Sequence, residues 1–154
     1  MGAVYFYHLT SSTLEQTLPM LLTKAQGAGW RVLVRGRQED RMDWLDEKLW
    51  LGADDGFLAH GRGGGEHDAD QPILLTTGSE NPNGAACLMA VDGASVEAEE
   101  IANMDRVCIL FDGNDAASLE SARGQWKALT DAGCAAQYWS QEGGKWEMQA
   151  QSDG

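Results

Sequence analysis

Hydrophobic and polar positions follow two different periods along this chain, and the two kinds of segment alternate. Short, nearly continuous apolar runs rich in β-branched and aromatic residues predict strands. Longer stretches whose apolar residues recur every three to four positions predict amphipathic helices. The predicted strands span residues 4–9, 30–36, 73–78, 86–93, 106–113 and 135–141. The predicted helices span residues 11–29, 37–50, 95–103 and 114–133.

This alternation predicts the α/β class, as a single-domain three-layer sandwich with a mostly parallel central sheet flanked by helices. Near-continuous apolar runs suit strands that are covered on both faces, so several runs are expected inside the sheet. These inner strands are residues 4–9, 30–35, 73–77 and 106–111. We expect one domain over residues 1–150 and take "GGKWEMQAQSDG" (143–154) as a tail, flexible at 151–154.

Local signals refine the first helix and the longest polar stretch. Ser12 and Glu15 have the spacing of a capping box, and Pro19 lies deep enough to kink or restart the helix. Residues 51–72 are rich in glycine and aspartate and are expected to form an exposed loop. A histidine in such a loop, His60, is expected to be solvated rather than bound to a metal.

Composition narrows the possible functions. The chain has 24 acidic and 11 basic residues and a formal net charge of −13. This balance argues against strong direct binding to nucleic acid, which needs a concentrated basic surface. No apolar run is long enough to cross a membrane, and no signal peptide is recognisable at the N-terminus. Cys87 and Cys108 lie in apolar runs and are expected to be buried, reduced thiols.

The usual catalytic patterns are not recognisable in the sequence. "GRGGGEH" (61–67) is glycine-rich, but it lacks the spacing and the lysine of a phosphate-binding loop. The histidines have no zinc-binding spacing, and no serine lies in a nucleophile elbow. The sequence therefore favours a binding function without a cofactor or a metal.

The last predicted helix carries two cations beside a tryptophan. Arg123 and Lys127 lie one turn apart, on the shoulder of an apolar stripe. In one interpretation Trp126 belongs to the core and the cations extend over its edge, and the helical pattern alone favours this interpretation. In the other, Trp126 walls a shallow apolar pocket whose rim cations receive a carboxylate, a task that suits the planar fork of arginine. The stripe consists of Leu119, Ala122, Trp126 and Leu129.

Four segments taken together resemble a known family. They are "VYFYHL" (4–9), "WRVLVRGRQEDRMDWLDEKLW" (30–50), "GFLAHG" (56–61) and "ARGQWKALTDAG" (122–133). In order and spacing they resemble the chi subunit of bacterial DNA polymerase III, part of the clamp-loader assembly. Two departures are Ala59, where the family usually has proline, and Gly124, which is expected to interrupt the last helix.

The resemblance implies a small α/β protein without catalytic activity. Such a protein binds the acidic C-terminal tail of single-stranded DNA-binding protein, which ends in phenylalanine, and pairs with the psi subunit. Carried over residue by residue, Arg123, Trp126 and Lys127 receive the tail, and Phe57 is a further candidate for the pocket wall. Fewer basic residues surround this helix than is usual in the family, so a weaker or more salt-sensitive tail site is expected.

Two alternatives stay open at this point. One is a small nucleotide-dependent enzyme on the same α/β scaffold, since a fold does not settle a function. The other is an interaction domain with an unrelated partner. Under the chi interpretation we expect a cytoplasmic protein of the bacterial replisome, with no membrane contact.

Overall fold

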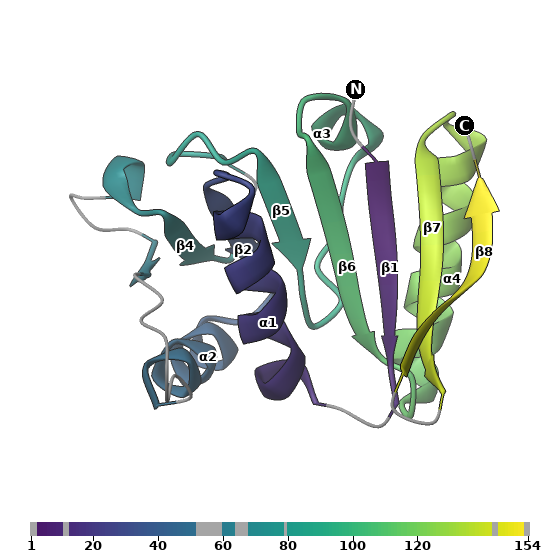
Figure 1. The fold of residues 1–154 in the computed structure, drawn as a ribbon, viewed down its shortest axis with the longest axis horizontal. Coiled ribbons are helices and arrows are strands. Elements are labelled where there is room, and N and C mark those ends of the chain that lie inside the picture. Colours follow the sequence, from purple (N-terminus) through teal and green to yellow (C-terminus); the bar gives the residue numbers. More distant parts are fainter. Residues whose placement is uncertain are drawn as a thin grey trace.

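The computed structural model describes residues 3–10, 13–51, 60–63, 68–78, 80–142 and 145–152. These residues form one eight-stranded sheet with helices on both faces (Figure 1). The elements are β1 (Ala3–Leu9), α1 (Leu14–Gly27), β2 (Val32–Arg35), α2 (Glu39–Leu51), β3 (Gly61–Arg62), the 3₁₀ turn η1 (Asp68–Asp70), β4 (Ile73–Thr76), β5 (Cys87–Ala90), α3 (Ala98–Ala102), β6 (Arg106–Asp112), α4 (Ala116–Asp131), β7 (Ala135–Glu142) and β8 (Lys145–Ser152).

The strand order is β3-β4-β2-β5-β6-β1-β7-β8, and all neighbours pair in parallel except β7 and β8. The predicted α/β sandwich with a mostly parallel sheet is thus confirmed. The four strands expected inside the sheet, β1, β2, β4 and β6, all lie between two other strands. Every residue of β2 and of β5 is buried, as expected for their apolar side chains, and the burial also includes the charged Arg35 of β2, which the apolar pattern did not predict.

Two hydrophobic cores lie on opposite faces of the sheet. Helices α1 and α2 cover one face, and α3 and α4 cover the other (Figure 1). Because side chains alternate along a strand, Val32 and Val34 pack into the first core while Leu33 packs into the second. Cys87 and Cys108 are buried free thiols in the first core, as predicted.

Helix α1 differs from its prediction in two details. Its N-cap is Thr13, whose backbone N–H donates to the Gln16 side chain at 3.0 Å, so the predicted Ser12–Glu15 capping pair is wrong by one residue. The helix also does not restart at Pro19, which lies inside a single helix from Leu14 to Gly27. None of the described helices is both long enough and apolar enough to cross a lipid bilayer.

The exposed loop predicted over 51–72 is wrong at His60 and at residues 61–62, whereas Ala69 and Asp70 are exposed as expected. Strand β3 extends the sheet there, and η1 precedes β4. His60 is only 6% exposed, and its Nε2 lies 3.2 Å from the backbone oxygen and 3.1 Å from a carboxylate oxygen of Asp46. The imidazole is therefore packed against α2 instead of being solvated, because a partner on another element satisfies its polar atoms.

The predicted tail is also wrong, because residues 145–152 form the edge strand β8. It pairs antiparallel with β7, with a register irregularity at Tyr138/Trp139. The segment has only weak strand character in its sequence, and its pairing with β7 supplies the hydrogen bonds that the strand needs. The last described residue, Ser152, pairs with Ala136.

Gly113 follows β6 at a point where the chain passes close to β1. Its N–H donates to the Leu9 carbonyl at 2.7 Å, and a Cβ at this position would overlap the His8 ring. We expect Gly113→Ala to lower the free energy of unfolding by about 1–3 kcal/mol, the usual cost of forcing atoms into a packed site. Gly124→Ala is the control, since a Cβ there meets no atom within 4 Å. It should stabilise α4 by up to about 1 kcal/mol. Urea unfolding measures both, and an unchanged midpoint for Gly113→Ala would contradict the close packing.

Candidate functional site

Helix α4 begins with a well-formed cap. The Asp115 carboxylate accepts hydrogen bonds from the Ser118 hydroxyl at 2.7 Å and from the Ser118 backbone N–H at 3.0 Å. These two bonds lower the pKa of Asp115, because both favour the charged form. The helix then runs without a break to Asp131, so the expected interruption at Gly124 is wrong.

The apolar stripe predicted on α4 is confirmed. Ala122 and Leu129 are buried, and Leu119 and Trp126 are half-buried against the core beneath them. The stripe fixes the rotation of the helix about its axis, because these side chains must face the sheet. It therefore also fixes where Arg123 and Lys127 point.

Trp126 is held by two aromatic rings of the sheet. Its ring centroid lies 5.4 Å from that of Phe6 and 5.9 Å from that of Tyr138, both edge-to-face. Tyr138 is itself anchored, since its hydroxyl lies 3.0 Å from Nδ1 of His8. The sequence pointed to Trp126 but not to these supports, which come from β1 and β7.

The two predicted cations differ in their surroundings. Lys127 Nζ lies 3.5 Å from a carboxylate oxygen of Asp131, and both side chains are more than two-thirds exposed. Arg123 is exposed and has no acidic partner among the described residues. Burial raises the pKa of the Tyr138 hydroxyl, and the positive charge of Arg123 partly offsets this, which places Arg123 near the aromatic cluster. Arg123 is thus the more available of the two cations. Phe57 lies outside the described residues.

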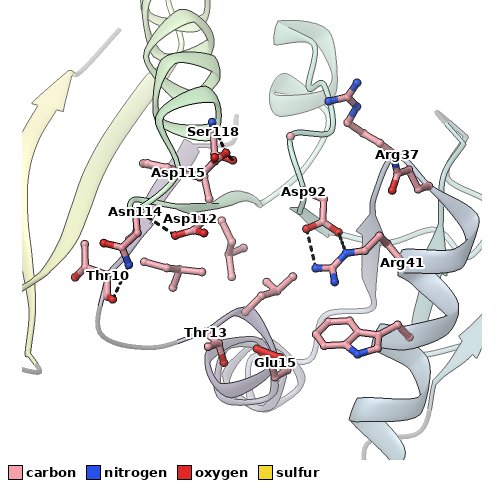
Figure 2. Close-up of a pocket in the computed structure, with 17 residues that line it drawn as sticks. Thr10, Thr13, Glu15, Arg37, Arg41, Asp92, Asp112, Asn114, Asp115 and Ser118 are labelled. Atoms are coloured by element: carbon pink, nitrogen blue, oxygen red, sulfur yellow. Dashed lines mark hydrogen bonds and ion pairs between the residues drawn. The ribbon is translucent and has the colours of Figure 1, made fainter.

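A second candidate location is a crevice of about 770 Å³ at the carboxyl ends of the parallel strands. Figure 2 shows side chains from the ends of several strands and from the starts of α1 and α4 facing it. From β1 and β6 the chain passes to helices on opposite faces of the sheet, which is where ligands bind in many open α/β sheets. No sequence motif marks these residues, although Asp92 and Asp112 lie at the ends of apolar runs.

The charges in this crevice do not suit a phosphate. Arg41 donates from Nε and Nη2 to Asp92 at 3.2 and 3.1 Å, and its guanidinium lies 4.3 Å from the centre of the Trp44 ring. Asp92 therefore largely neutralises Arg41. Arg37 is then the one remaining cation among the described lining residues, and the lining also carries the carboxylates of Glu15, Asp112 and Asp115. These carboxylates would repel an anion.

No group of three or more acidic, histidine or cysteine side chains is placed to hold a metal ion, as far as the described ranges extend. The crevice thus offers neither a phosphate cradle nor a metal centre in the described part of the chain. The exposed cation beside an anchored tryptophan on α4 is the better candidate for a functional site.

Comparison with known proteins points to the same family as the sequence segments. The sequence model of the family "DNA polymerase III chi subunit, HolC" matches residues 1–137. The chain belongs to this family. The chi subunit is a non-catalytic accessory subunit of the polymerase.

One curated relative is similar over part of its length. The probable DNA polymerase III subunit chi of Rickettsia prowazekii (strain Madrid E) is 22% identical over 90 residues. The aligned part is 58% of this chain and 54% of the relative, so the chain spans about half the length of that chi protein. The match to the family model includes all of α4 and thus the three described candidate residues, Arg123, Trp126 and Lys127.

Proposed function

We propose that this chain is a non-catalytic subunit of the DNA polymerase III clamp-loader assembly that binds the acidic C-terminal tail of single-stranded DNA-binding protein. The tail ends in phenylalanine. In this proposal its ring packs beside Trp126 and its terminal carboxylate is bound by Arg123. Lys127 attracts the acidic residues upstream, and Phe57 is a further candidate for the wall.

The observation that carries this proposal is the environment of Arg123. The guanidinium is exposed and free of an acidic partner among the described residues, on a chain with a net charge of −13. Beside it, Trp126 is held in place by Phe6 and Tyr138 but stays only half-buried. An anchored aromatic ring next to an available guanidinium is suited to an apolar residue that carries a carboxylate.

In the same proposal, the chain links the single-stranded DNA-binding protein to the replisome through psi, in the bacterial cytoplasm. Psi would bind a different face from α4, so that both partners are held at once. A pull-down from a native lysate tests this link. Recovery of single-stranded DNA-binding protein together with clamp-loader subunits would support it, and recovery of neither would contradict it.

A thermal-shift experiment separates tail binding from the nucleotide-dependent alternative. A ligand that binds only the folded state raises Tm, by an amount that grows with its concentration relative to Kd. We expect an acidic peptide ending in phenylalanine to raise Tm, and we expect ATP and GTP to leave it unchanged because carboxylates dominate the crevice. A Tm increase with nucleotide but not with peptide would reverse the assignment.

A further inference from the structure

A groove lies on the face of the sheet that carries α1, far from the α4 site. Figure 1 shows that α1 and α2 leave β1, β7 and β8 without a helix on this face, whereas α4 covers the opposite face. The groove has a volume of about 420 Å³ and runs between α1 and these strands. Five aromatic side chains line it: Tyr5, Tyr7, Trp30, Trp139 and Trp146.

Edge-to-face packing orders part of the aromatic lining, and the indole donor of Trp139 is hydrogen-bonded within the fold. The rings of Tyr7 and Trp146 meet edge-to-face with centroids 5.3 Å apart. Burial raises the pKa of the Tyr7 hydroxyl. The indole N–H of Trp139 donates to the Gln137 side chain at 3.0 Å, so this donor already has its acceptor within the fold. A partner thus meets a preformed apolar surface.

Two methionines extend this surface. Met20 on α1 and Met148 on β8 are 42% and 46% exposed, the largest exposures of big apolar side chains among the described residues. Met20 lines the groove, and Met148 shares a face of β8 with Trp146, because side chains two residues apart in a strand point the same way. Exposed apolar side chains that gather on one face mark interaction sites.

The charges in the groove are of one sign. Lys24 and Arg106 are its charged lining residues, and no described acidic side chain pairs with either. The Arg106 guanidinium lies 4.0 Å from the centre of the Tyr5 ring and 5.5 Å from that of Trp30. A cation–π contact of this kind uses the face of the guanidinium, so its N–H groups stay available to an acceptor.

We propose that this groove docks an amphipathic helix of a partner protein, with apolar side chains against the aromatic lining and a carboxylate bound by Arg106. A helix here would complete the layer that α1 and α2 begin, since helices pack beside one another on a sheet. The groove is positive within a strongly acidic chain, which selects an acidic helix by charge complementarity.

Two other occupants fit the charges less well. A second copy meeting this face symmetrically would bring Lys24 and Arg106 close to their own counterparts, and like charges would oppose the contact. A nucleic acid needs a track of cations along its backbone, whereas the groove offers two on a chain of net charge −13. The proposal does not depend on tail binding, because α4 lies on the opposite face.

The test uses the full chain and two fluorescent helical peptides of the same Leu-Ala pattern, one with glutamates and one with lysines on its polar face. We expect the glutamate peptide to bind at least tenfold more tightly than the lysine peptide by anisotropy. Met20→Glu, at an exposed position that should not disturb folding, and Arg106→Gln should each weaken glutamate-peptide binding by about tenfold, the loss expected for one charge-assisted contact.

Matched controls locate the binding. Ala102→Glu adds the same charge at an exposed position of α3 on the other face and should not change the affinity. Arg123→Ala should not change it either, so loss of tail binding and loss of groove binding are told apart. The proposal is overturned by absent binding, by equal affinity for both peptides or by wild-type affinity in Met20→Glu. Two further outcomes would assign the groove to another occupant and overturn the proposal. In one, Met20→Glu abolishes binding of a single-stranded oligonucleotide, and in the other it dissociates a dimer of this chain seen by sedimentation.

Discussion

Replacing Arg123 with alanine lowers the affinity for an acidic, phenylalanine-ended peptide by about 10- to 100-fold. The change removes a charge-assisted contact worth about 1.5–3 kcal/mol beside a partly desolvated ring. Titration of the fluorescent peptide against both proteins measures this loss. The fold should be unaffected, because Arg123 is exposed and no described acidic side chain pairs with it. Equal affinities would support the other interpretation, in which Trp126 belongs to the core and Arg123 only extends over its edge.

Lys127→Ala is the matched comparison on the same helix. It should cost less, because Lys127 already has Asp131 within 3.5 Å and is 81% exposed, where solvent screens its attraction to the tail. Added salt should weaken peptide binding to the wild type, because the acidic peptide is attracted by the local cations in spite of the negative net charge of the whole chain, and salt screens this attraction. Binding that strengthens with salt would contradict this site.

Glu100→Ala should lower the free energy of unfolding by about 3 kcal/mol, because it leaves a buried cation without its carboxylate. Arg35 is 4% exposed, and its Nη1 and Nη2 donate to the two Glu100 oxygens at 2.9 and 2.7 Å. The pair links β2 to α3, which covers the face of the sheet toward which Arg35 points. Urea unfolding measures the loss, with Glu99→Ala at the neighbouring, exposed position of α3 as a control that should change stability little.

The same pair predicts a pH dependence. Burial by itself would raise the pKa of Glu100, but hydrogen bonds from Arg35 and from the Glu97 backbone N–H lower it below the ordinary value of 4.5. The stabilisation is therefore fully present above that value and disappears as pH falls through the lower folded pKa. The stability difference between wild type and Glu100→Ala should be constant above about pH 5.5 and shrink below pH 4.5. A difference that grows in acid would exclude this ion pair as its source.

The elements that depend only on the local sequence were predicted well. The six apolar runs all became strands of the sheet, since a run covered on both faces needs apolar side chains at every position. The stripe on α4 was correct because helical periodicity follows from the backbone geometry alone. The capping pair of α1 was missed by one residue, as several polar residues in a row offer similar caps.

Features that need a distant partner were not predicted. Strand β8 exists because β7 pairs with it, and His60 is buried because Asp46 on α2 lies beside it. Arg35 carried no signal in the sequence, since its partner Glu100 is 65 positions away. In each case the stabilising contact joins elements that only the order of strands in the sheet brings together.

The candidate site divides in the same way. The sequence by itself determined the fold class, the helix that carries Arg123 and Lys127, and the position of Trp126 on its apolar stripe, because these follow from periodicity and spacing. Only the tertiary structure decided that Phe6 and Tyr138 hold Trp126, that Arg123 has no acidic partner among the described residues, and that an aromatic groove opens on the opposite face. These features depend on which strands become neighbours and which faces the helices cover, and those choices are made by packing of the whole chain.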